Sequence, residues 1–315
     1  EFRRVLFRSP DLVQISGGEP TLHPDFFAIL DAVRARPIRH VMINTNGLRI
    51  AREPDFVAKL AANKRGLEVY LQFDSLKREA LVNLRGADLR KIRQQALENL
   101  ERYGVSTTLV ATIKRGVNDA EIGDIIRHAL TWKCVRGVTL QPVQDAGRNE
   151  AFNKDTDRIM LSEIRQRVIE TGVFGDKDMI PLPCNPESVS IGYGLRSGDK
   201  VLPLTSLIPQ EQLVAVMPNT ISPEKYPVLR EKFVDLFSLS SGPLNTSERV
   251  CELLCCLPSF EVPEGLTYEN VFRVTIVQFL DRFNFCVGNV KRSCIHFVDR
   301  KSTRLNSSHC YISRM

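Results

Sequence analysis

The chain has 315 residues, 43% of them hydrophobic, and a formal net charge of +6. This length and apolar share are enough for one large domain, or for one domain with a smaller lobe. No apolar run reaches the ~18 residues of a membrane span and no signal peptide is visible, which favours a cytoplasmic protein. A peripheral association with a membrane stays open.

Both ends of the sequence are interpreted as translated sequencing adapter rather than protein. Val5–Ser9 fit the codons GTG CTC TTC CGA TCT, and Asp299–Ser302 fit GAT CGG AAG AGC, the reverse complement of the same stretch. We therefore expect residues 1–9 and 299–315 to be non-native and the reading frame to be cut at both ends. Without these segments the net charge falls to about +1, so no nucleic-acid partner is predicted.

Residues 10–150 alternate between short apolar runs and amphipathic runs. Helices are predicted where apolar residues recur at helical spacing, as at Phe26, Phe27, Leu30 and Val33. Asn118 and Glu121 resemble a capping box. The further predicted helices are 51–62, 88–103 and 119–131. The predicted strands are 12–16, 40–46, 68–74, 106–113 and 137–143.

This alternation predicts an α/β fold with a parallel sheet, in the form of an α/β barrel or partial barrel. Buried parallel strands are expected to be continuously apolar. Ligands bind at the carboxyl ends of such strands, and here every end is polar or rich in glycine. These ends are residues 16–20, 44–47, 72–75, 112–114 and 141–144.

The pattern changes in the second half of the chain. A helix is predicted at 155–172, a proline-rich turn at 181–188, a hairpin at 192–205 and more helix at 221–257. Residues 266–298 are mixed, with a helix-like apolar run at 271–280. We predict a barrel domain at 10–175 and a smaller α+β region for auxiliary clusters or substrate at 176–298.

The most informative stretch is ISGGEPTLHPDFF, residues 15–27. A Gly-Gly pair after a strand lets the backbone approach a ligand closely, because no Cβ intervenes. Together with TNG at the next strand end and FDS at the following one, it resembles the radical S-adenosylmethionine (SAM) enzymes, whose partial barrel carries GGEP. The resemblance covers about residues 12–150 and implies that Gly17, Gly18, Glu19 and Pro20 bind the methionine end of SAM.

Six further residues follow from the same resemblance. Asn44, Asn46, Gln72 and Asp74 would face the ribose or the substrate, and Thr112 and Gln141 would lie near the adenosyl group. The alternative for each is an ordinary polar strand end.

The family also has a CxxxCxxC motif, which binds a [4Fe–4S] cluster and leaves one iron for SAM. The sequence has no such motif. We expect that loop to lie upstream of the adapter junction, so that the parent enzyme is active and this fragment is not. The resemblance implies that a reduced cluster cleaves SAM to a 5′-deoxyadenosyl radical, which abstracts hydrogen from the substrate, with ferredoxin or flavodoxin as electron donor.

Seven cysteines remain once Cys310 is excluded with its segment, an odd number that favours metal ligation over disulfides. Cys134 and Cys286 are in apolar contexts and are expected to be structural. The alternative for any free cysteine is a buried small hydrophobe. The candidate ligands of an auxiliary Fe–S cluster are Cys184, Cys251, Cys255, Cys256 and Cys294.

A longer pattern, including LQFDSL, KRGVNDAEIG, PLPCNPES and CIHFV, is similar to the tetraether lipid synthase subgroup, whose members couple lipid tails. Lipid coupling is therefore one prediction. The alternatives are a MoaA-like cyclisation, the maturation of a peptide or cofactor, or a non-catalytic Fe–S electron-transfer or assembly protein. An apolar channel to the barrel mouth would favour a lipid substrate, and a polar pocket would argue against one.

Overall fold

The computed structural model describes residues 12–38, 40–145, 149, 151–182, 185–206, 210–216, 271–292, 296–297 and 305–306. Within these ranges one sheet has the order β1-β2-β3-β4-β5-β9-β7-β6, and β8 pairs with β7. Strands β1 to β5 and β9 all run parallel to one another, whereas β7 is antiparallel to β9. The predicted α/β class with a parallel sheet is confirmed.

The strands predicted in the first half are all present, with ends shifted by one or two residues. They are β1 (Leu12–Ile15), β2 (His40–Thr45), β3 (Leu67–Gln72), β4 (Thr107–Ile113) and β5 (Val135–Pro142). The later strands are β6 (Ile180–Pro181), β7 (Val189–Ser197), β8 (Lys200–Pro203), β9 (Val271–Val277), β10 (His296–Phe297) and β11 (Leu305–Asn306).

Helices connect the parallel strands, as predicted, although α5 was not expected from the sequence. The α-helices are α2 (Phe26–Arg34), α3 (Leu48–Arg52), α4 (Pro54–Ala61), α5 (Arg78–Arg85), α6 (Arg90–Tyr103), α7 (Ile122–Leu130), α8 (Lys154–Asp157), α9 (Leu161–Glu170), α10 (Gln210–Val216) and α13 (Val287–Arg292). Short 3₁₀ helices are η1 (Pro20–Leu22), η2 (Asp119–Glu121), η3 (Asp176–Asp178) and η4 (Leu204–Ser206).

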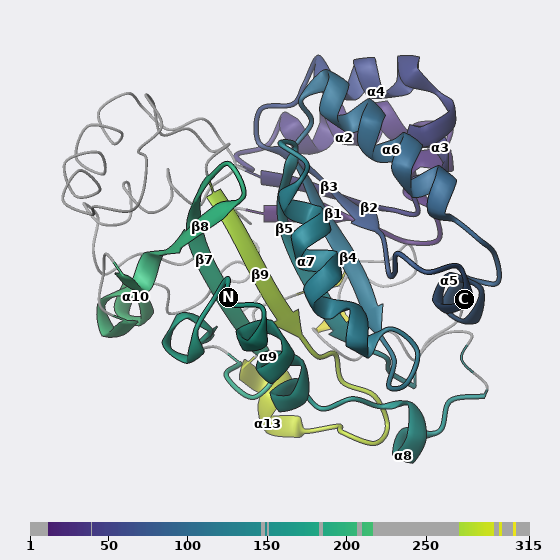
Figure 1. The fold of residues 1–315 in the computed structure, drawn as a ribbon. Coiled ribbons are helices and arrows are strands. Elements are labelled where there is room, and N and C mark those ends of the chain that lie inside the picture. The colour runs from purple at the N-terminus through teal and green to yellow at the C-terminus, as the bar shows by residue number, and fades with distance from the viewer. Residues whose placement is uncertain are drawn as a thin grey trace.

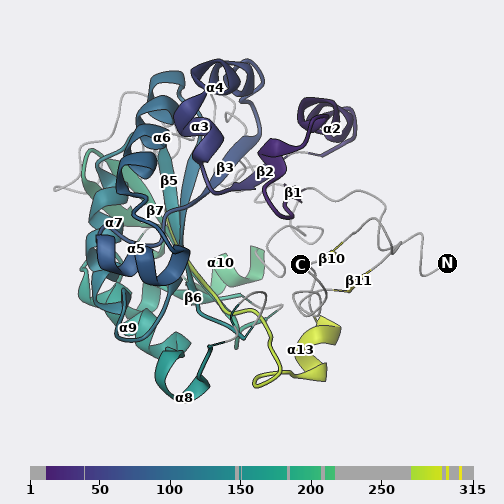
Figure 2. The ribbon, with the colours of Figure 1, turned by 90° about the vertical axis from the view of Figure 1, so that its right-hand side faces the viewer.

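The helices α3, α4, α6, α7 and α9 lie along one side of the curved sheet (Figures 1 and 2). Under them, alternate strand residues such as Ile43, Val69, Leu109 and Val274 are fully buried in the main hydrophobic core. Burial of this much apolar surface is the dominant force that holds helices to a sheet. We call this side the outer face of the sheet and the opposite side the inner face.

The expectation of continuously apolar strands is wrong. In β3, Leu67, Val69 and Leu71 face the helices, whereas Glu68 and Gln72 alternate with them on the inner face. Successive side chains of a strand point to opposite faces, and only the outer face is covered by helices here. The alternation of apolar and polar residues in β3 therefore reflects a sheet with one apolar face and one polar face.

The apolar run at 271–280, predicted to resemble a helix, contains the strand β9 instead. Phe272, Val274 and Ile276 are buried on the outer face, while Arg273 and Thr275 point to the inner face. The segment forms a strand because it pairs with β5 on one side and with β7 on the other, and its apolar residues then alternate with a period of two.

The predicted hairpin is confirmed as β7 and β8, which are joined at Gly198 and Asp199, and Gly198 has φ +62°. The helix predicted at 155–172 is present as α8 and α9. The helical region predicted at 221–257 lies outside the described residues.

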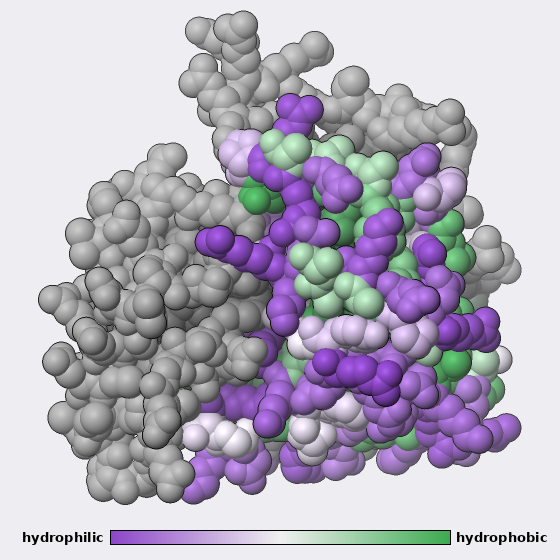
Figure 3. All heavy atoms as spheres, turned by 90° about the horizontal axis from the view of Figure 1, so that it is seen from above, coloured by the Kyte–Doolittle hydropathy of each residue, from purple (hydrophilic) through white to green (hydrophobic). Residues whose placement is uncertain are grey.

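Among the described residues, no helix is both long enough and apolar enough to cross a membrane. Seen from above, the described surface is largely hydrophilic, with small hydrophobic islands between the polar residues (Figure 3).

Candidate functional site

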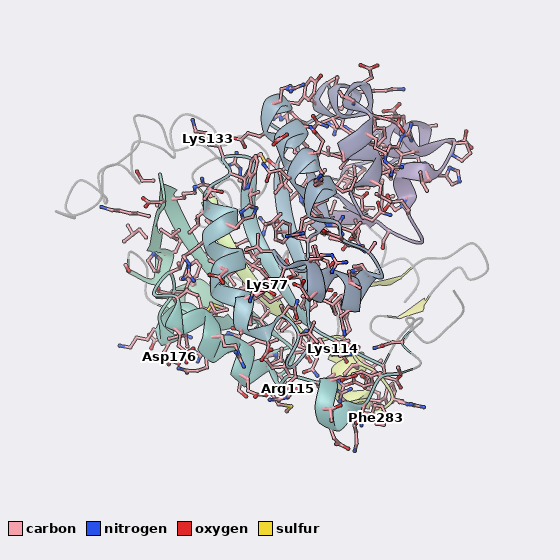
Figure 4. The ribbon with its side chains drawn as sticks, turned by 45° about the vertical axis from the view of Figure 1, so that its right-hand side comes forward. Lys77, Lys114, Arg115, Lys133, Asp176 and Phe283 are labelled. Atoms are coloured by element: carbon pink, nitrogen blue, oxygen red, sulfur yellow. The ribbon has the colours of Figure 1, made fainter. Side chains whose placement is uncertain are left out.

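The carboxyl ends of β1 to β5 lie at one edge of the sheet, because the five strands are parallel and in register. Lys114 and Arg115, just after β4, mark this edge in Figure 4, and Lys133, which precedes β5, lies toward the opposite end of the molecule. The polar residues predicted to surround a mouth are therefore brought to a common edge.

Glu19 joins the ends of the first two strands. Its Oε1 accepts hydrogen bonds from Thr21 Oγ1 at 2.5 Å and Thr45 Oγ1 at 2.7 Å. Its Oε2 accepts from the backbone N–H of Asn46 at 2.7 Å. These charge-assisted bonds fix the turn after β1 against the end of β2. The Glu19 carboxylate is thus engaged by the protein, which leaves the main chain of the turn for a ligand.

Gly17 and Gly18 present an open stretch of main chain. Both are exposed, and Gly17 has φ +143°, a conformation that L side chains rarely adopt. A Cβ built at either glycine meets no atom within 4 Å. Within the described part of the chain, no other group forms a hydrogen bond with their N–H or C=O. The turn therefore leaves main-chain groups open to a ligand, and its contact with SAM stays a prediction.

Asp74 holds the end of β3 from inside the protein. Its side chain is fully buried, and its φ of +66° lies in the left-handed region that Asp tolerates better than most residues. The carboxylate accepts two hydrogen bonds of 2.7 Å from Arg85 and one of 3.1 Å from the Thr112 N–H. Contact of Asp74 with a ligand stays a prediction.

Arg93 on α6 links the ends of β2 and β3. It donates from Nη1 to the carbonyl oxygen of Asn46, and its Nη2 lies 4.0 Å from Asp74 Oδ2. Its side chain is 3% exposed, and this burial lowers the pKa of Arg93 to about 10. The sequence did carry a signal for this residue, because Arg93 falls on the same helical face as the buried Ala96, Leu97 and Leu100.

The predicted capping box at Asn118 and Glu121 is wrong. The Asn118 side chain donates at 2.8 Å to the carbonyl oxygens of Asp74 and Thr112. Glu121 instead accepts hydrogen bonds from Ser75 Oγ and the Leu76 N–H. Both side chains are drawn away from the helix start because the buried main chain after β3 needs partners. They therefore fasten the ends of β3 and β4.

Four of the predicted residues, Asn44, Gln72, Thr112 and Gln141, lie on the inner face. Register places Asn44 opposite Tyr70, Thr112 opposite Gln141, and Gln72 beside Val110. All four are partly exposed. Other polar residues of the same face, from β3, β5, β7 and β9, are Tyr70, Thr139, Tyr193 and Thr275.

The floor of the inner face is a buried ion pair between β3 and β9. Arg273 Nη2 donates to both Glu68 oxygens at 2.5 and 2.6 Å, and to Thr108 Oγ1 at 3.0 Å. The His40 Nε2 lies 3.3 Å from Glu68. Burial alone would raise the pKa of Glu68, but Arg273, His40 and Thr108 together lower it to about 2.

Two tyrosines stand beside this ion pair. Burial raises the pKa of Tyr70 to about 12 and raises that of Tyr193. Both phenols therefore stay protonated at neutral pH and can donate hydrogen bonds.

The candidate ligands of an auxiliary cluster, Cys184, Cys251, Cys255, Cys256 and Cys294, all lie outside the described residues. Across the described ranges, no group of three metal-ligating side chains comes together.

Cys134 is buried, as expected for a structural residue, and burial raises the pKa of its thiol. Cys286, expected to be structural on the same grounds, is exposed.

Comparison with known proteins gives one family and several relatives. The model of the Radical SAM superfamily matches residues 1–129. A 7,8-dihydro-6-hydroxymethylpterin dimethyltransferase of Methanocaldococcus jannaschii is 28% identical over 90% of this chain and 63% of its own length. A GTP 3′,8-cyclase of Synechocystis is 24% identical over 49% of this chain and 46% of its own.

The mycofactocin maturase MftC of Mycobacterium ulcerans is 33% identical over 36% of this chain and 29% of its own length. The chain thus spans less than two thirds of each of these relatives. A solved domain of pyruvate-formate lyase-activating enzyme from Bacteroides vulgatus aligns with 20% identity and a TM-score of 0.38 over 50% of this chain and 91% of that one. The family model, over residues 1–129, and the curated relatives support membership of the radical SAM superfamily.

Proposed function

We propose that the described residues bind SAM and a small polar heterocycle of the pterin class for a radical SAM enzyme. The substrate class is inferred from the inner face of the sheet. This face presents partly exposed amides and hydroxyls next to a buried ion pair. Asn and Gln side chains each offer a donor and an acceptor, as the edge of a pterin ring does. The relative that covers 90% of the chain, a pterin dimethyltransferase, supports the same class.

The chain's own residues divide the work along the edge. The open main chain of Gly17 and Gly18 would hold the methionine end of SAM, while Glu19 fixes that turn to β2. Gln72 and Gln141 would orient the heterocycle from neighbouring parts of the inner face. When bound with its iron–sulfur cluster, SAM supplies the radical chemistry. The sequence holds no CxxxCxxC, the motif that would bind this cluster.

Lipid coupling is supported less well than a heterocycle. Hydrogen-bonding groups that face an alkyl chain would lose water without gaining partners, which costs free energy. The inner face carries Asn44, Gln72, Thr139 and Gln141 where a lipid channel would need apolar side chains. A polar lining argues against a lipid substrate and favours the alternative enzyme types, a MoaA-like cyclisation or the maturation of a peptide or cofactor. The auxiliary cluster and a ferredoxin or flavodoxin donor stay part of the proposal.

Binding of 6-hydroxymethylpterin, followed through its own fluorescence, tests the proposed substrate class. We expect Gln72→Leu and Gln141→Leu each to weaken binding about tenfold, as the loss of one well-placed hydrogen bond does. Gln94→Leu is the matched control, because Gln94 is exposed on α6 and, among the described residues, its side chain hydrogen-bonds to Glu98 alone. Equal affinity in all four proteins, or tighter binding of a long-chain fatty acid than of the pterin, would contradict the proposal.

A further inference from the structure

Arg93 on α6 holds the turn between β2 and α3 from inside the protein. Its Nη1 donates to the carbonyl oxygen of Asn46, and its Nη2 lies 4.0 Å from the Asp74 carboxylate. The side chain is 3% exposed, so both contacts are made away from solvent. A planar guanidinium can serve two partners in fixed directions at once, which a single ammonium group cannot. Arg93 therefore ties the position of Asn46 to that of Asp74.

The backbone of Asn46 is fixed on its other side by Glu19. The Glu19 Oε2 accepts a hydrogen bond from the Asn46 N–H at 2.7 Å, while Arg93 binds the carbonyl oxygen of the same residue. One residue later, the Gly47 N–H donates to Thr45 Oγ1 at 3.1 Å. Asn46 is thus held between a buried cation and a carboxylate that directly follows the glycine turn after β1.

The side chain of Asn46 keeps one group for a ligand. Its Oδ1 accepts the Leu48 N–H at 2.9 Å, and this bond sets which end of the amide faces α3, because an N–H needs an acceptor. The other end, Nδ2, carries two donors. Among the residues that the structure describes, none accepts a hydrogen bond from Nδ2, and Asn46 is partly exposed. Asn46 therefore presents an oriented donor close to the glycine turn.

Arg196 on β7 shows that a buried arginine need not have such a role. It donates at 2.8 to 3.2 Å to the carbonyl oxygens of Leu130, Trp132 and Val135, which lie just before β5 or at its start, away from the carboxyl edge. Burial lowers the pKa of Arg196, as it lowers that of Arg93. The two arginines share burial and carbonyl partners, but of the two, Arg93 alone holds a residue of the carboxyl edge.

We propose that Arg93 is a positioning residue for SAM: by holding the Asn46 carbonyl oxygen, it directs Asn46 Nδ2 toward an oxygen atom of the SAM that the glycine turn binds. This inference rests on the proposed function and adds a residue that acts on the ligand through Asn46. The contact itself would be a hydrogen bond donated by the Asn46 amide. Loss of the Arg93 fork should therefore weaken SAM binding only as long as Asn46 keeps its amide.

A double-mutant cycle between Arg93 and Asn46 tests the proposal. Arg93→Lys keeps a cation beside Asp74 but has a single arm, so SAM affinity by equilibrium dialysis should fall about tenfold. In the Asn46→Ala background, the same substitution should have no further effect, because the group that it positions is missing. Arg196→Lys is the matched control and should bind SAM like the wild type. The thermal midpoint of each variant checks that it is folded.

Additive losses in the cycle, or an unchanged affinity in Arg93→Lys, would overturn the role of Arg93. An unchanged affinity in Asn46→Ala would overturn it even if Arg93→Lys failed to fold, because Arg93 would then have no contact to position.

No binding of SAM to the wild type would contradict the proposed function instead. In that case, hydrogen exchange of the Leu48 amide, which Asn46 Oδ1 protects, decides on Arg93 without a ligand. Exchange about tenfold faster in Arg93→Lys than in the wild type and in Arg196→Lys supports the positioning of Asn46. Equal exchange rates in the three proteins reject it.

Discussion

Single residues at the carboxyl edge act mainly by fixing main chain. The side chains of Glu19, Asp74 and Asn118 hydrogen-bond to neighbouring strand ends, so the proposal assigns ligand contact to the glycines and the inner-face amides instead. The glycine turn could be predicted from the sequence because its chemistry is local. The burial of Arg93 had a local signal in the helical face it shares with Ala96 and Leu100, but the contact of Arg85 and Arg93 with Asp74 had none, because that residue lies 11 and 19 positions away along the chain.

Glu19→Gln tests whether the hydrogen bonds of the Glu19 carboxylate stabilise the turn after β1. The substitution places an NH₂ group against donors that now point at carboxylate oxygens, at the Asn46 N–H or at the two threonine hydroxyls. We expect the free energy of unfolding in urea to fall by about 1–3 kcal/mol. Glu53→Gln, in an exposed pair with Arg49, should change it by less than about 0.5 kcal/mol. Comparable small effects in both variants would show that the Glu19 hydrogen bonds do not stabilise the turn.

At the scale of elements, the first five strands were predictable because each carries β-branched or apolar residues bounded by polar or glycine-rich ends. Strand β9 was misread because Phe272, Ile276 and Leu280 also fit a helical face. Pairing with β5 makes this segment a strand. Gly137 on β5 has no side chain, which leaves room for the backbone oxygen and Cγ of Arg273 on β9. This space lets the Arg273 side chain cross β5 to reach Thr108 and Glu68.

A pair of glycine substitutions tests this packing. A Cβ at Gly137 would lie 2.5 Å from the Arg273 carbonyl oxygen, so Gly137→Ala should lower the free energy of unfolding by about 1–3 kcal/mol. At Gly123, in α7, the nearest atom is the flexible end of Arg127 at 3.2 Å. There the higher helix propensity of alanine should stabilise the protein by up to about 1 kcal/mol. A neutral Gly137→Ala in chemical denaturation would rule out the close packing of β5 on β9.

At the scale of the whole molecule, the Glu68–Arg273 pair joins residues 205 positions apart in the sequence. No local pattern predicts such a pair, because it forms only when β9 closes against β5. The same long-range closure creates the inner face, whose polar residues come from strands in both halves of the chain.

This pair predicts a pH dependence. The folded-state pKa of Glu68 is about 2, below its ordinary value of 4.5, so its stabilisation is complete above pH 4.5 and is lost as pH falls toward 2. Free energies of unfolding measured between pH 6 and 3 should fall for the wild type, and less steeply for Glu68→Gln. Identical slopes for the two proteins would show that the pair does not contribute to acid sensitivity.

The central claim is that the main chain at Gly17 and Gly18 binds SAM, and SAM binding to Gly18→Ala tests it most directly. The new Cβ meets no protein atom within 4 Å, so the thermal midpoint should not change. It would, however, occupy the space through which the ligand approaches, and we predict that SAM affinity by equilibrium dialysis falls at least tenfold. Gly288→Ala, where the nearest atom is Cys286 Sγ at 3.7 Å, should bind SAM like the wild type. An unchanged SAM affinity in Gly18→Ala, or no binding of SAM by the wild type, would contradict the account.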